Sequence, residues 1–204
     1  MSDNTIYHDY DDHIIHNNDM TDNIIDNIID GSLITKTIRN EMFGSCDKGA
    51  NTSNPENYQR QTISKLTNLP CLKTNIRINL RTNNLTELCY PNKSINGFDY
   101  SENFDGIQTL KDKKIYINLK CIVGTGGSQT RSLREVYWFV QGQLNILIQP
   151  SSSNIYFANI MDGDEASHSF SKFSYLLDLP IYSSIKHKIY VGDLKHYFDW
   201  FNSI

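Results

Sequence analysis

Apolar and polar residues alternate over residues 103–123, and this period of two predicts a β-hairpin. One face of its second strand is apolar and is expected to pack in the core: Ile115, Ile117, Leu119, Cys121 and Val123. The opposite face places Asn118 and Lys120 between apolar residues, so we expect that face to be only half covered. Two polar side chains at this position require a specific explanation.

The spacing of apolar residues on either side of the hairpin predicts helices and further strands. Helices are expected around residues 24–29, 55–68, 130–141, 167–177 and 194–202. Strands are expected around residues 74–80, 85–89, 144–149, 154–160 and 188–191. The helix at 130–141 has the length of a crossover connection, which predicts that strands 115–123 and 144–149 are parallel. The expected fold class is therefore α/β (α+β), with one central mixed sheet flanked by helices.

Composition divides the chain into a tail and one domain. Residues 1–20 are rich in Asp, Asn and His without apolar periodicity, which predicts a flexible acidic tail before a single domain at residues 21–204. Residues 1–30 hold eight of the 23 acidic residues and none of the 19 basic ones, so residues 31–204 carry about +4. A mildly basic domain is compatible with a polyanionic partner.

Targeting and membrane signals are absent from the sequence. It has no basic leader followed by an apolar run, and no stretch approaches the ~18 apolar residues of a membrane span. The four cysteines form no C-x-x-C pair of the kind that holds zinc. We expect a soluble intracellular protein without membrane contact.

A two-residue turn at residues 111–112 would place Asp105 directly opposite Asn118. Cross-strand Cβ atoms in that relation lie about 4.5–5.5 Å apart, and the diagonal neighbour, Lys120, would lie about 7–8 Å away. Three polar side chains would then share one patch. The spacing alone is also that of an ordinary solvated hairpin, so both interpretations stay open.

Asp105, followed by Asn118-Leu119-Lys120, resembles the motif of the PD-(D/E)xK nuclease superfamily, which includes restriction endonucleases and lambda-type exonucleases. The resemblance covers roughly residues 50–150. It implies a restriction-endonuclease-like core and a site for Mg²⁺ or Mn²⁺. In that site Asp105 would be a metal ligand, Leu119 would offer its carbonyl, and Lys120 would activate the attacking water.

Asn118 departs from this motif, in which a carboxylate is usual. An amide oxygen can coordinate a cation or hydrogen-bond the water, but it contributes no charge. The resemblance offers two replacements: Glu135, on the helix after the strand, and Glu56, in the first turn of the helix at 55–68. Glu56 is equally well explained as a first-turn acid that complements the helix dipole.

The helix at 130–141 has a polar face with Arg131, Arg134, Glu135 and Trp138. Gln129, Arg131 and Arg134 follow a glycine loop at the start of this helix, a combination that suits a DNA phosphate. Arg134 and Trp138 could equally form an ordinary surface stack.

The resemblance therefore implies a Mg²⁺- or Mn²⁺-dependent deoxyribonuclease with catalytic residues Asp105, Asn118, Lys120 and Glu135. The resemblance also implies a homodimer or a higher oligomer, because exonucleases of this fold often pair or close a ring around DNA. Two alternatives remain: a catalytically weakened relative that only binds nucleic acid or a protein partner, and a viral structural or assembly protein. The composition, rich in Asn, Ile, Lys and Tyr, is similar to that of proteins from giant viruses of amoebae, which would place the chain in the host cytoplasm.

Overall fold

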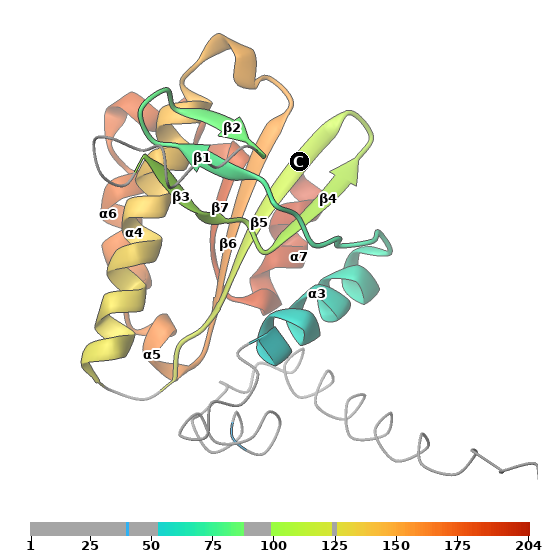
Figure 1. Cartoon of the computed structure of the whole chain (residues 1–204), viewed down its shortest axis with the longest axis vertical. Coiled ribbons are helices and arrows are strands. Elements are labelled where there is room, and N and C mark those ends of the chain that lie inside the picture. Colours follow the sequence, from blue (N-terminus) through green and yellow to red (C-terminus); the bar gives the residue numbers. More distant parts are fainter. Residues whose placement is uncertain (1–39, 41–52, 88–98, 124–125) are drawn as a thin grey trace, which may run out of the picture. The chain divides into compact units, whose positions relative to one another are not determined.

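A four-stranded mixed sheet is the centre of the computed structural model, which describes residue 40 and residues 53–87, 99–123 and 126–204 (Figure 1). All of these residues belong to one unit that spans residues 33–204. The predicted tail at residues 1–20 and the predicted helix at 24–29 lie outside the described residues.

The central sheet has the strand order β4-β5-β6-β7. Its strands are β4 (Gly106–Leu110), β5 (Lys113–Cys121), β6 (Ile155–Asp162) and β7 (Ile189–Gly192). β4 and β5 form the predicted antiparallel hairpin, while β5, β6 and β7 are parallel. Leu110 pairs with Lys113, which confirms the two-residue turn, and Lys111 makes it possible by adopting a φ of 57°.

A second sheet corrects the expectation of a single one. β1 (Arg77–Asn79), β2 (Asn84–Thr86) and β3 (Tyr100–Asn103) form an antiparallel sheet in the order β2-β1-β3. The chain leaves this sheet at Phe104, which is buried, and enters β4 two residues later. Short, polar, half-exposed strands cannot supply the apolar faces of a central strand, so they form a separate layer.

The described residues include five α-helices: α3 (Ser53–Thr67), α4 (Gly127–Leu147), α5 (Asp164–Ser167), α6 (Phe170–Leu177) and α7 (Leu194–Ser203). Short 3-10 turns occupy Pro150–Ser152, Pro180–Tyr182 and Lys186–Lys188. The helix predicted at 167–177 is found as α6, which begins three residues later at Phe170, and the short α5 precedes it. α4 and α6 cover one side of the central sheet, and α3 and α7 cover the other (Figure 1).

α4 is longer than predicted and replaces the strand expected at residues 144–149, which was wrong. The buried positions Val136, Val140, Leu144 and Leu147 continue one helical stripe past Gly142. Gly142 does not end the helix, and a Cβ there would lie at an ordinary contact distance of 3.5 Å from Cδ1 of Ile78. The predicted crossover does exist, but the parallel partner of β5 is β6.

Both faces of β5 are buried, so the expectation of a half-covered face was also wrong. Ile115 and Ile117 have no exposed surface on the side of α3 and α7. On the α4 side, Tyr116 joins an aromatic cluster with Phe104 and Phe157, at ring-centroid distances of 5.4 and 6.0 Å. A central strand between parallel and antiparallel neighbours is covered by helices on both sides, which buries Asn118 as well.

Candidate functional site

Asp105 lies where the chain enters the central sheet. The β4–β5 pairing extends to Gly106 opposite Ile117, and the backbone N–H of Asp105 donates to the carbonyl of Ile117 at 2.9 Å. Asp105 is therefore the next residue in register and stands opposite Asn118. The predicted register of the hairpin is confirmed.

The carboxylate of Asp105 extends the hydrogen bonding between β4 and β5 beyond the end of β4. Its Oδ2 atom accepts a hydrogen bond from the backbone N–H of Leu119 at 2.7 Å. Carbonyls two residues apart on a strand point to the same side, so the carbonyl of Leu119 points, like that of Ile117, toward Asp105. A carboxylate and a backbone carbonyl, two oxygen donors of the kind that Mg²⁺ and Mn²⁺ accept, are thus adjacent.

Charged groups from two elements, α3 and β5, act on Asp105. Burial raises the pKa of this carboxyl to about 6; the hydrogen bond from Leu119 lowers it, the charge of Glu56 raises it, and the charges of Lys120 and Arg60 lower it. Glu56 on α3 and Lys120 on β5 therefore both lie within electrostatic reach of Asp105. The structure thus brings together Asp105, Glu56 and Lys120, three residues that the sequence analysis assigned to one site.

Lys120 holds an ion pair that sequence reasoning missed. Its Nζ atom donates to Oε2 of Glu102, on β3, at 3.4 Å. Glu102 is three-quarters exposed and Lys120 one-quarter, so water screens the pair and its contribution to stability is small, about 0–1 kcal/mol. Glu102 belongs to a polar segment before Phe104, and nothing in the sequence of that segment indicates a contact with Lys120.

Asn118 is part of a buried amide network. Its Nδ2 donates to Oδ1 of Asn159 at 3.3 Å, and Asn159 exchanges hydrogen bonds with Gln143 of α4 at 2.6 and 3.0 Å. All three side chains are buried. Because the amide nitrogen of Asn118 is committed to this network, its oxygen is the atom that remains for a ligand.

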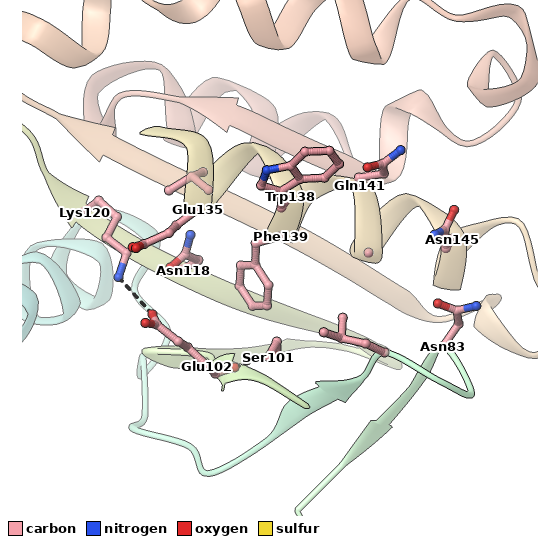
Figure 2. A pocket seen from close by; sticks show the side chains of 13 residues that line it. Asn83, Ser101, Glu102, Asn118, Lys120, Glu135, Trp138, Phe139, Gln141 and Asn145 are labelled. Carbon is pink, nitrogen blue, oxygen red and sulfur yellow. Dashed lines mark hydrogen bonds and ion pairs between the residues drawn. The ribbon is translucent and has the colours of Figure 1, made fainter. Parts of the chain in front are cut away.

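A cavity of about 790 Å³ opens beside Asn118 and Lys120, and Glu135 of α4 contributes to its wall. Figure 2 shows the Glu135 carboxylate between Lys120 and Asn118, at the same end of the cavity as Glu102. Glu135 is not among the groups whose charge shifts the pKa of Asp105, whereas Glu56 is. The two candidate carboxylates thus approach the site from opposite sides of the sheet.

α3 holds Glu56 in place through its neighbours on the helix. Nη1 of Arg60 donates to the backbone carbonyl of Asp105 at 3.0 Å. Nε2 of Gln59 donates to the carbonyl of Lys120 at 3.3 Å and to Oδ2 of Asp162 at 2.6 Å. α3 is therefore attached to the ends of both β5 and β6, and the first-turn acid Glu56 is carried to the site.

Asp162, at the end of β6, is a second buried carboxylate that the sequence did not identify. Oδ1 accepts a hydrogen bond from the backbone N–H of Leu194 at 2.9 Å. Burial raises its pKa to about 6, the hydrogen bonds from Leu194 and Gln59 lower it, and the charge of Asp193 raises it. An acid directly after an apolar strand is common at loop starts, so no sequence signal distinguished it.

The predicted DNA-binding residues lie on the first two turns of α4. Arg131 and Arg134 are exposed and Gln129 is half-buried, and none of the three lines the cavity. Leu133 and Val136, on the same helix, are buried. Contact of these residues with DNA stays a prediction.

Within the described ranges, no three side chains of His, Cys, Asp or Glu are grouped as a ready-made metal site. A cation bound at Asp105 would therefore also need the Leu119 carbonyl or the Asn118 amide oxygen. These residues fit a hard divalent ion, because the Asp105 carboxylate lies beside the Leu119 backbone and the charge of Glu56 reaches Asp105.

Among the helices that the structure describes, none has the length and apolar character needed to cross a membrane. Comparisons of the chain with protein-family models, with characterised proteins and with solved structures found no match.

Proposed function

We propose that this protein is a metal-dependent nuclease that hydrolyses DNA phosphodiester bonds. The observation that carries the proposal is the arrangement of Asp105, Leu119 and Lys120: a buried carboxylate hydrogen-bonded to the strand that bears the lysine, with the intervening carbonyl pointing toward the carboxylate. This is the arrangement that the PD-(D/E)xK resemblance implies. A helix, a hairpin, a crossover helix and a parallel strand are compatible with a restriction-endonuclease-like core.

The charges around Lys120 support a bound cation. Four carboxylates, those of Asp105, Glu56, Glu102 and Glu135, surround two cationic groups, Lys120 and Arg60. A DNA phosphate would be repelled by this net negative charge. A divalent cation on Asp105 would cancel this net negative charge and allow the phosphate to approach.

Each residue has a distinct part in the proposed hydrolysis. Mg²⁺ or Mn²⁺ would supply Lewis acidity toward the phosphate and lower the pKa of a bound water. Asp105 and the Leu119 carbonyl would hold the ion, assisted by Glu56 or Glu135. Lys120, released from Glu102, would orient the attacking water, whose oxygen bonds to phosphorus as the P–O bond to the leaving sugar oxygen breaks. Asn118 would fix the water or the ion through its amide oxygen.

The test is cleavage of DNA in the presence of Mg²⁺, Mn²⁺ or EDTA. Wild type is expected to cleave with either metal and not with EDTA, and Asp105→Ala and Lys120→Ala are expected to be inactive. Lys114→Ala is the matched control, because Lys114 is an exposed lysine on the same strand. Equal activity in all four proteins would refute the proposal.

One observation favours a second function, that of a nuclease-fold protein that binds nucleic acid without cutting it. Asn118 replaces the usual carboxylate and is tied into a structural amide network. DNA binding without cleavage under every metal condition would support this second function over the first.

A further inference from the structure

Of the proposed catalytic residues, only Asn118, Lys120 and Glu135 line the cavity beside Lys120, and most of its wall lies outside that site. Its wall comes from α4, from β5 and from the small sheet, and includes Glu102, Lys120, Trp138, Phe139 and Asn145. Figure 2 shows charged groups at one end, aromatic rings in the middle, and three amide side chains at the other end. Binding of a metal ion would require only the charged end of the cavity, and not its aromatic middle or its amide end.

The middle of the cavity presents aromatic and apolar surface. Trp138 is 65% exposed, although tryptophan side chains are highly buried on average. Its orientation is defined by an edge-to-face contact with Tyr137, at 6.0 Å between ring centroids. The neighbouring Phe139 is anchored in the core by Phe104 at 4.8 Å, and Leu80 remains 43% exposed. A planar ligand could stack here without any rearrangement of the core.

The far end offers hydrogen-bonding groups that the described part of the chain does not use. Asn83, Gln141 and Asn145 line it, and within the described ranges none of their side-chain amides makes a hydrogen bond. The bonds that Asn83 and Asn145 accept from Gln149 go to their backbone carbonyls. Side-chain amides present a donor and an acceptor together, which matches the edge of a nucleobase.

We propose that this cavity binds an unpaired nucleotide of a single-stranded DNA segment, with the base stacked at Trp138 and its edge facing the amide end. The proposal rests on the nuclease function, because the charged end at Lys120 is then where the strand's phosphate reacts. Pockets of about 300–1,000 Å³ enclose ligands of this size. In a duplex the faces and pairing edges of the bases are already occupied, so the cavity favours single strands or frayed ends.

The test uses a short single-stranded oligothymidylate, and the same strand in a duplex, with Ca²⁺ in place of the catalytic metals. The chain has two tryptophans, so Trp200→Phe leaves Trp138 as the only indole reporter. The single strand is expected to quench Trp138 fluorescence, and the duplex is expected to require a higher concentration. Affinity measured with a labelled strand is expected to fall roughly 5- to 150-fold in Trp138→Ala.

Two further variants separate cavity binding from general surface effects. Tyr175→Ala removes an exposed aromatic of α6 that does not line the cavity, and unchanged affinity is expected. Asn145→Ala, at the far end, is expected to weaken binding of the single strand with little effect on the melting temperature. Equal affinity for single strand and duplex, or unchanged affinity in both Trp138→Ala and Asn145→Ala, would overturn the proposal.

The cleavage assay keeps this inference distinguishable from the nuclease proposal. Selective binding of single strands through Trp138 with no metal-dependent cleavage would refute the nuclease function alone. Metal-dependent cleavage of duplex DNA that is insensitive to Trp138→Ala would refute the cavity's role alone.

Discussion

The carboxylate of Asp105 accepts the backbone N–H of Leu119 at 2.7 Å, so the strand that carries Lys120 also positions the proposed metal ligand. Packing also constrains the next residue, because a Cβ on Gly106 would lie 2.7 Å from Sγ of Cys71. The order Asp-Gly is thus required by packing on one side and by hydrogen bonding on the other. The carboxylate is held in place before any cation binds, which is the condition for a preorganised site.

Asp105→Asn should separate the charge of this residue from its hydrogen bond. The amide oxygen can still accept from Leu119, so we expect the fold to be retained and the melting temperature to be unchanged or higher, since a buried charge is removed. Metal-dependent cleavage should fall at least about 100-fold, because the ion loses an anionic ligand. Initial cleavage rates and thermal unfolding measure the two effects. The exposed turn residue Asp112, changed to Asn, is the control, and wild-type cleavage by Asp105→Asn would contradict the role.

Glu56→Gln and Glu135→Gln should differ in their effect on metal binding. Only Glu56 of this pair acts on Asp105 through its charge, so we expect Glu56→Gln to need a higher Mn²⁺ concentration for half-maximal cleavage. Glu135 lies with Lys120 in the cavity, and Glu135→Gln should change the rate more than the Mn²⁺ requirement. A Mn²⁺ titration of the cleavage rate distinguishes them. The reverse order would make Glu135 the replacement for the carboxylate missing at position 118.

The parts of the site that could be predicted are those set by local rules. Strand alternation and the turn at residues 111–112 fix the register of the hairpin, and this alone places Asp105 opposite Asn118. The face of α4 that carries Glu135 and Trp138 likewise follows from helical periodicity, which runs correctly through residues 130–141.

The parts that could not be predicted depend on contacts between distant segments. Gly142 is of a residue type that often ends a helix, but α4 continues through it because Leu144 and Leu147 are buried in the core. The partners of Asn118 and the ion pair of Glu102 are likewise chosen by the packing of α4 and of the second sheet. At these positions the structure is determined by tertiary packing and not by the local helix or strand propensity of the sequence.

Restoring the missing carboxylate with Asn118→Asp should destabilise the protein. The Nδ2 atom of Asn118 donates to Oδ1 of Asn159, and a carboxylate would place two acceptors against each other in a buried site. We expect a loss of about 1–3 kcal/mol in the free energy of unfolding, measured by urea denaturation. Asn154→Asp, at an exposed position just before β6, is the control for a general effect of charge. Unchanged stability would mean that the amides of Asn159 and Gln143 turn over to donate to the new carboxylate.

Asp162 should make the stability of the protein fall as the pH rises from about 4 to about 6. Burial raises the pKa of its carboxyl to about 6 in the native state, against about 4 in an unfolded chain. Across that window the native state binds a proton that the unfolded state has released, so the free energy of unfolding decreases with rising pH, by at most about 1.4 kcal/mol per pH unit for this group. Asp105, with a pKa raised to a similar value, acts in the same direction.

Asp162→Asn should remove this part of the pH dependence without loss of the fold. The amide oxygen can accept from Leu194, and its nitrogen can donate to Oε1 of Gln59, a buried atom that has no hydrogen-bond partner in the described part of the chain, once the Gln59 amide turns. Urea denaturation of wild type, Asp162→Asn and the exposed control Asp112→Asn between about pH 4 and pH 7 measures the slopes. The slope should be smaller in Asp162→Asn and unchanged in Asp112→Asn. An identical slope in all three would show that Asp162 stays ionised in the native state, held by Gln59 and Leu194.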